Sequence, residues 1–195
     1  MGYSFSKYVN FYNDQYEELF VNDLSNMEKV LADFEEKIKY HHLQHEKLND
    51  DSSIYKLVLV NESDRFVDAI AFFEFDDAFS LVGLVVCTRN ARDSKQNEFV
   101  YSVGYCVKEK YRGNGVADRL VAESILGLKS FWGSSGPNLD IGPDNSFKYT
   151  LESVVAQKNE PSNRLAKKLL HSGGDVVVAK EYRSQEISNV YRMSI

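Results

Sequence analysis

The stretch from Val100 to Phe131 reads VYSVGYCVKEKYRGNGVADRLVAESILGLKSF and contains the pattern that decides the fold. Its first part, with Phe99 before it, is a β-branched and aromatic run that predicts a strand over residues 99–107. From about Asn114, apolar residues recur at helical spacing along one face: Ala117, Val121, Ile125, Leu128 and Trp132. The stretch therefore predicts a strand that passes into a helix over residues 114–132.

A short turn, Tyr111-Arg112-Gly113-Asn114-Gly115-Val116-Ala117, joins the two elements. Backbone N–H groups at a helix N-terminus have no intrahelical acceptor, and the helix macrodipole is positive there. Glycines let a ligand come close to the backbone, so the turn predicts a phosphate site. It is not a Walker loop, because no Lys-Ser/Thr pair follows Gly115, and the glycine spacing of a dinucleotide fingerprint is absent. The alternative is a turn that only connects the strand to the helix.

The composition is that of a globular protein, with 195 residues, 43% hydrophobic and 13% aromatic. Because no Gly/Ser/Pro-rich linker divides the chain, we expect one domain over residues 1–195. The formal net charge of −6 argues against a dedicated nucleic-acid binder, which usually has a basic face. The sequence has no signal peptide and no apolar run of membrane-spanning length, so we expect a cytoplasmic protein without a membrane partner.

The N-terminal region, residues 1–50, shows helical periodicity from Asp14 to about Lys47, with a break at residues 22–26. We predict two helices there. His41 and His45 would lie one turn apart, but a metal site needs three or four ligands and no partner cluster is visible. We therefore expect a solvated helix end and no metal. The two cysteines lie in apolar runs and are expected to be small buried residues rather than a disulfide or a metal pair.

Four β-type runs follow, at residues 54–60, 66–75, 79–88 and 99–107. Their short connections favour antiparallel neighbours, and the last run is apolar on both sides, as in a central strand covered on both faces. After the helix and a loop over residues 133–146, we expect a strand at 149–156, a helix from Pro161 to Gly173, and a hairpin of residues 176–179 and 187–193. The fold class is α/β (α+β layered), with a mixed, mostly antiparallel central sheet flanked by helices.

The sequence resembles the GNAT superfamily of acyl-CoA-dependent N-acyltransferases. The hallmark of that family is Arg/Gln-x-x-Gly-x-Gly/Ala between a central strand and a helix, and residues 112–117 match it, with Val107 five residues before the arginine. A second match lies downstream in the family's order: Val155, Asn159, Ser162, Arg164-Leu165 and Lys168-Leu169. The resemblance covers about residues 54–193 and implies a GNAT-like fold.

The resemblance also implies where acetyl-CoA, as acyl donor, would bind. Main-chain N–H groups of Arg112 to Ala117 would hold the pyrophosphate, and the Arg112 side chain would add a charge or, alternatively, point to water. The end of the central strand would pair with the pantetheine arm. Asn159 and Ser162 would lie near the pantetheine or the thiol, or would only cap a helix. The expected cofactor-binding residues are Tyr105, Cys106, Val107, Arg112, Gly113, Asn114, Gly115, Val116, Ala117, Asn159 and Ser162.

The implied reaction is direct attack of an amine, from a small molecule or a protein, on the thioester carbonyl. An alkylamine is protonated at neutral pH, so a base must take its proton. The candidates are Glu98 and Glu74, each of which could instead be a solvated strand-end charge, and a backbone N–H near Val107 would meet the oxyanion. Some family members have a tyrosine acid where this chain has Ala166, so a catalytically silent acyl-CoA-binding sensor or interaction module is the alternative. A homodimer stays open.

Overall fold

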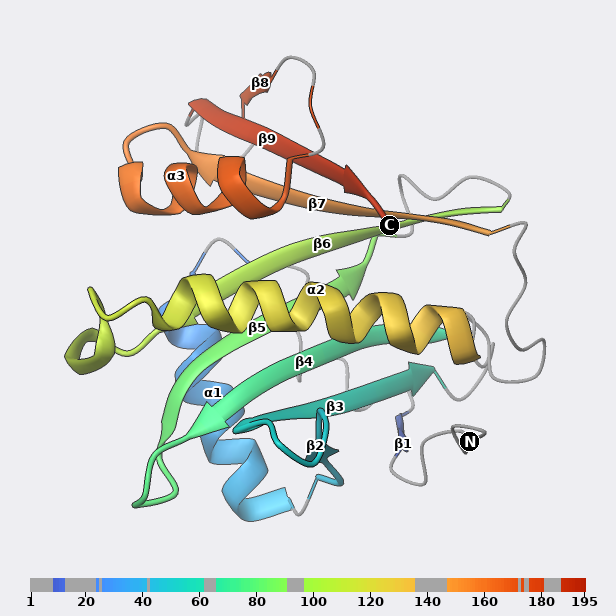
Figure 1. Cartoon of the computed structure of the whole chain (residues 1–195), viewed down its shortest axis with the longest axis vertical. Helices are drawn as coiled ribbons and strands as arrows, with labels where there is room; N and C mark the ends of the chain where they lie inside the picture. The colour runs from blue at the N-terminus through green and yellow to red at the C-terminus, as the bar shows by residue number, and fades with distance from the viewer. Residues whose placement is uncertain are drawn as a thin grey trace. The chain divides into compact units, whose positions relative to one another are not determined.

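The computed structural model describes residues 9–12, 24, 26–41, 43–61, 66–90, 97–135, 147–171, 173, 176–180 and 187–195 (Figure 1). They belong to two compact units: Met1–Thr88 with Gly104–Asn145, and Arg89–Val103 with Ser146–Ile195. The long strand β6 (Glu98–Val107) contributes residues to both units. The expectation of a single domain stays a prediction.

The first unit is a sheet with a helix on each face. Its elements are β1 (Val9–Tyr12), α1 (Met27–His41), β2 (Glu46–Lys47), β3 (Ile54–Asn61), β4 (Val67–Phe75), β5 (Leu81–Arg89), the end of β6, the short 3₁₀ helix η2 (Glu109–Tyr111) and α2 (Val116–Ser135). The strand order is β1-β3-β4-β5, continuing to β6, with β2 paired to β3. The β1–β3 pair is parallel, whereas β2–β3, β3–β4 and β4–β5 are antiparallel.

The two faces of this sheet are apolar because residues of both alternating sets are buried along β4 and β5. On one face, Leu31 and Phe34 of α1 join a buried cluster with residues such as Phe73 of β4. On the other face, α2 packs so closely that a Cβ on its Gly127 would come within 2.9 Å of the Phe72 ring. Figure 1 shows the two helices on opposite faces, with α2 in front of the strands and α1 behind them.

The second unit has the first part of β6, β7 (Lys148–Ala156), α3 (Glu160–Leu169), β8 (Val177–Lys180) and β9 (Ile187–Ser194). β6 pairs with β7 in parallel over residues 98–102 and 148–152, and β7–β9 and β8–β9 are antiparallel. α3 packs on β7 and β9 through its buried Leu165 and Ala166. The sheets of the two units are therefore mixed and mostly antiparallel.

The predicted fold class is confirmed, as are the four strands before α2, α2 itself, the strand after it and the terminal hairpin. The helix predicted from Pro161 is present, but it ends at Leu169 rather than at Gly173, because Leu170 leaves helical geometry at φ −117°. Of the two predicted N-terminal helices, α1 is the second; the first lies outside the described residues, as does most of the loop 133–146.

The prediction that helical structure continues to about Lys47 is wrong. α1 ends at His41, and Glu46–Lys47 form a strand on β3, where Glu46 makes an ion pair with Lys56 at 2.9 Å. His45 is consequently not on a helix with His41. Its ring packs against Tyr55 and Phe73, with ring centroids 5.5 Å away in both cases, because the turn after α1 folds this segment onto the sheet. A solvated helix end is therefore the wrong description of His45.

None of the helices in the described part of the chain is both long and apolar enough to cross a membrane.

Gly104 of β6 sets the distance between the sheet and α1. A Cβ at this position would overlap the Met27 sulfur and come within 3.2 Å of Leu24. Gly104→Ala should therefore destabilise the protein by about 1–3 kcal/mol, the usual cost of overpacking. Gly133→Ala is the matched control, because nothing lies within 4 Å of a Cβ there, and alanine in α2 should be neutral or stabilising. Urea unfolding of both variants measures this, and equal stabilities would contradict it.

Candidate functional site

The predicted turn lies between β6 and α2, within the first unit. η2 ends at Tyr111, Arg112 follows it, and α2 begins at Val116. The first helical hydrogen bond runs from the Arg119 N–H to the Gly115 carbonyl oxygen, at 3.1 Å. Gly113 and Gly115 have φ angles of +80° and +72°, which side chains rarely adopt, and no atom lies within 4 Å of a Cβ on either. The backbone of this turn is therefore open on the side where a side chain would stand.

The main-chain N–H groups of the turn are the donors that a bound ligand would meet. Within the described part of the chain, the N–H groups of residues 113–117 donate to no protein acceptor. The N–H of Arg112 does have an acceptor, the Glu109 carbonyl oxygen at 3.1 Å. Of the main-chain N–H groups predicted to hold the pyrophosphate, Arg112 to Ala117, only those of Gly113–Ala117 are therefore free to do so. Successive free N–H groups at the positive end of a helix are an arrangement that can bind an anion.

The Arg112 side chain lies against the protein rather than pointing to water. Its Nε donates to the Val107 carbonyl oxygen at 2.8 Å, and its Nη2 donates to Glu28 of α1 at 2.6 Å. The hydrogen bond to Glu28 is the main reason why the pKa of Arg112 is raised. The guanidinium therefore joins the end of β6 to the first turn of α1.

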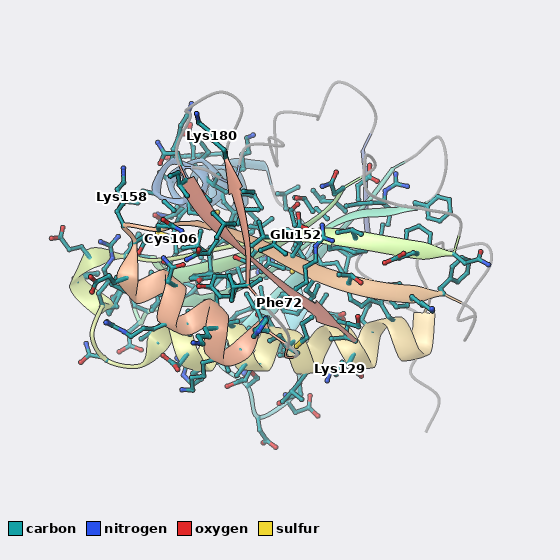
Figure 2. The ribbon with its side chains drawn as sticks, turned by 90° about the horizontal axis from the view of Figure 1, so that it is seen from above. Phe72, Cys106, Lys129, Glu152, Lys158 and Lys180 are labelled. Carbon is teal, nitrogen blue, oxygen red and sulfur yellow. The ribbon has the colours of Figure 1, made fainter. Side chains whose placement is uncertain are left out.

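A pocket of about 210 Å³ opens beside this ion pair, lined by Glu28, Leu31, Cys106, Lys108, Glu109 and Arg112. Cys106, whose position is labelled in Figure 2, is half-buried near the end of β6, and burial raises the pKa of its thiol. A thiol with a raised pKa is a weak nucleophile at neutral pH. The predicted pantetheine-binding residues Tyr105 to Val107 are on the same strand.

The segment before the turn is fixed by two carboxylates. Lys108 donates to Glu35 of α1 at 2.6 Å and to the Ser80 hydroxyl at 2.7 Å. Burial would raise the pKa of Glu35, but the hydrogen bonds from Lys108, Ser80, the Leu81 N–H and Lys39 outweigh it and lower that pKa to about 2. Glu35 is thus ionised at neutral pH.

Asp76 is the second of these carboxylates and holds η2. Its Oδ2 accepts a hydrogen bond from the Tyr111 hydroxyl at 2.5 Å and from Lys110 at 3.2 Å. Its Oδ1 accepts from the Ser80 N–H at 2.9 Å and so also closes the turn between β4 and β5. The hydrogen bond from Tyr111, followed by that from the Ser80 N–H, lowers the pKa of Asp76 well below its usual range.

The two candidate bases belong to different units. Glu74 lies on β4 in the first unit, is buried, and accepts hydrogen bonds from Ser53 and from Arg119 of α2, both at 2.5 Å. Glu98 is the first residue of β6, in the second unit, and is half-buried opposite Lys148 of β7. Their catalytic role stays a prediction.

Asn159 and Ser162 are in the second unit, at the start of α3. The Asn159 side chain is the N-cap of the helix and accepts a hydrogen bond from the Ser162 N–H at 3.2 Å. Both residues thus take part in a helix cap, which was the alternative to a place near pantetheine. That place stays a prediction.

Sequence reasoning missed Glu28, Glu35 and Asp76. The charged run from Lys108 to Arg112 was visible, but its partners lie 34 to 84 residues away along the chain, so only the fold identifies them. The described residues contain no group of three or more His, Cys, Asp or Glu side chains placed to hold a metal ion.

No protein-family model matches the chain, and no curated protein matches its sequence. Among solved structures, it is similar to a GNAT-family acetyltransferase from Streptococcus pneumoniae, with 15% identity, a TM-score of 0.47 and coverage of 69% of both chains. It is also similar to a ribosomal-protein-S5-alanine acetyltransferase from Vibrio fischeri (18%, TM-score 0.45, covering 65% of this chain and 61% of that one) and to a spermidine N-acetyltransferase from Vibrio cholerae (15%, TM-score 0.43, 66% and 65%).

The resemblance to the GNAT family rests on the two sequence motifs and stays a prediction. The chain spans about two thirds of the length of these structures.

The lowered pKa of Glu35 predicts acid sensitivity. A carboxylate whose folded pKa is depressed stabilises the fold above its unfolded pKa, and this contribution is lost as the pH falls through the folded value. Between pH 4.5 and about 2 the protein should lose on the order of 1–3 kcal/mol from this group. Glu35→Gln should remove that part of the pH dependence, whereas Glu36→Gln, at the exposed neighbouring position, should keep it. Urea unfolding at pH 6, 4 and 3 measures both; parallel profiles for the two variants would contradict the assignment.

Proposed function

We propose that the chain is an acyl-CoA-dependent N-acyltransferase of the GNAT superfamily, which transfers an acetyl group from acetyl-CoA to a primary amine of a small molecule or a protein. One observation carries the proposal. The Arg-Gly-Asn-Gly-Val-Ala motif forms an open turn at the start of α2, with both glycines at positive φ and free N–H groups at residues 113–117. Without side chains at these two positions, the pyrophosphate could come close to the backbone of the turn.

The residues present fit the pyrophosphate of acetyl-CoA. The N–H groups of Gly113, Asn114, Gly115, Val116 and Ala117 would donate to its oxygens. The backbone of Tyr105–Val107 would pair with the pantetheine arm as an added strand does, and Asn159 and Ser162 would lie near its thiol end. When bound, acetyl-CoA supplies a thioester whose carbonyl an amine can attack.

Proton removal from the amine is the step that this chain's side chains must assist. Deprotonating an alkylamine of pKa ~10.4 at pH 7 costs about 4–5 kcal/mol, so a base or a water chain to one is needed. Glu98 and Glu74 are the candidates. Glu74 would act while it accepts hydrogen bonds from Ser53 and Arg119. A backbone N–H near Val107 would meet the oxyanion.

A second function, a catalytically silent acyl-CoA-binding module, is favoured by one observation on α3. Ala166, at the position where some family members have a tyrosine acid, is completely buried. Alanine has no ionisable group, so this position supplies no general acid. Such a module would keep the cofactor turn and lack turnover.

Calorimetric titration of the purified chain with acetyl-CoA, followed by thiol release in the presence of a panel of amines, tests both functions. Binding with release of CoA thiol supports the acyltransferase, and binding without release from any amine supports the silent module. If no binding is detected at millimolar acetyl-CoA, both proposals fail.

Gly115→Asp should abolish acetyl-CoA binding, because it places a side chain and a negative charge where the pyrophosphate would lie. The matched control is Gly173→Asp in the second unit: Gly173 also has a positive φ, +107°, and open space at its Cβ position, so this change adds the same charge away from the turn. Both variants should lose about 1–2 kcal/mol of stability. Titration and thermal unfolding measure the two effects; wild-type affinity in Gly115→Asp would show that the cofactor site is elsewhere.

A further inference from the structure

The cationic side chains next to the turn are all directed to carboxylates of this chain. Lys108 contacts Glu35, Lys110 contacts Asp76, and Arg112 contacts Glu28. These three cations are the Lys and Arg residues of the segment 108–112. A diphosphate at the turn would therefore meet main-chain N–H groups and cations that are already neutralised.

The Arg112 contacts have a specific geometry. The planar guanidinium offers donors in a fixed fork, and here two of them are directed to the end of β6 and to α1. The acceptor on β6 is the carbonyl oxygen of Val107, five residues before Arg112. Arg112 thus ties the residue that starts the turn back to the strand that leads into it, while Glu28 holds the guanidinium from the other side.

We propose that Arg112 and Glu28 are a pair of positioning residues, which hold the Gly113–Ala117 backbone in its anion-binding conformation, and that the Arg112 side chain is not itself a phosphate ligand. The proposal rests on the proposed function, since it concerns the site that would take acetyl-CoA. It changes the role first expected for Arg112, which was to add a positive charge to the phosphate site.

A direct phosphate-binding role of Arg112 predicts the opposite effect on acetyl-CoA affinity when Glu28 is removed. If Arg112 bound the phosphate directly, it would have to leave Glu28, so that Glu28 would compete with the ligand and its removal would tighten binding. If the pair positions the turn, removal of Glu28 weakens binding. The pair is half-exposed, with 49% and 73% of the two side chains accessible, and exposed ion pairs contribute about 0.2–1 kcal/mol, which corresponds to an affinity change of about 1.5–5-fold.

The test uses acetyl-CoA titration of the full chain at several salt concentrations with four variants: Glu28→Gln, Arg112→Gln, Arg112→Lys and the double variant Glu28→Gln/Arg112→Gln. We expect Glu28→Gln to weaken binding about 1.5–5-fold, and the double variant to bind no more weakly than Arg112→Gln alone. Arg112→Lys should be weakened like Arg112→Gln, because lysine keeps the charge but lacks the fork. The salt dependence should stay that of the wild type. Tighter binding by Glu28→Gln, or a reduced salt dependence in Arg112→Gln that Arg112→Lys restores, would overturn the proposal.

Hydrogen exchange at the amides of residues 113–117 gives a readout that does not depend on acetyl-CoA. Both Glu28→Gln and Arg112→Gln should accelerate exchange there. Glu46→Gln, which removes the ion pair with Lys56 on β2 and β3, is the matched control and should leave exchange at the turn and the affinity unchanged. If the wild type binds no acetyl-CoA, the proposed function fails, and accelerated exchange still supports the positioning pair. Unchanged exchange in both variants refutes the pair.

Discussion

The ion pair between Glu35 of α1 and Lys108, 2.6 Å apart, is the interaction on which the candidate site depends. Lys108 is the first residue after β6, and its N–H also bonds to the Val82 carbonyl oxygen of β5 at 3.0 Å. Glu35 lies next to Phe34, which is almost completely buried against the sheet. The packing of Phe34 against the sheet thus also positions the Glu35 carboxylate, and the pairing of Glu35 with Lys108 holds the chain just before the turn.

Most of the strands and helices could be predicted from the sequence, because the patterns that indicate them lie within short segments of the chain. The β-branched runs of residues 54–107 and the helical spacing of 117–132 each report burial on one or two faces. The end of α1 could not be predicted in this way, since Glu46–Lys47 form a strand only through their pairing with Tyr55 and Lys56. The same holds for His45, whose aromatic neighbours Tyr55 and Phe73 are brought together by the sheet.

For the candidate site too, the sequence indicates some features and not others. The positions of Gly113 and Gly115 follow from their need for positive φ, which is a property of the residues themselves. The partners of the charged run beside them could not be found from spacing, because an ion pair between residues 73 positions apart leaves no periodic trace. From the sequence, Arg112 is expected to add its charge to the phosphate site, whereas the structure pairs it with Glu28.

An anion site built from main-chain N–H groups differs chemically from one built from basic side chains. Peptide dipoles do not titrate, and their orientation is set by the turn rather than by flexible side chains, so little conformational entropy is lost on binding. The carboxylates around the turn would repel an anion if their charge were unbalanced. Their pairing with Lys108, Lys110 and Arg112 removes most of that repulsion. The network would thus make an acidic protein, with a net charge of −6, compatible with the proposed site for a negatively charged group.

The two thiols of the chain, Cys87 and Cys106, differ in how easily an alkylating reagent could reach them. Cys87 of β5 is completely buried, and burial raises its pKa to about 12, so an alkylating reagent would find almost no thiolate there at neutral pH. Its labelling would need the sheet to open beside β4, to which Cys87 is paired through Ile70. Cys106 lies at a pocket on the surface and needs only local access. The labelling rate of Cys87 would therefore report how often the core opens. The labelling rate of Cys106 would report local opening at the end of β6.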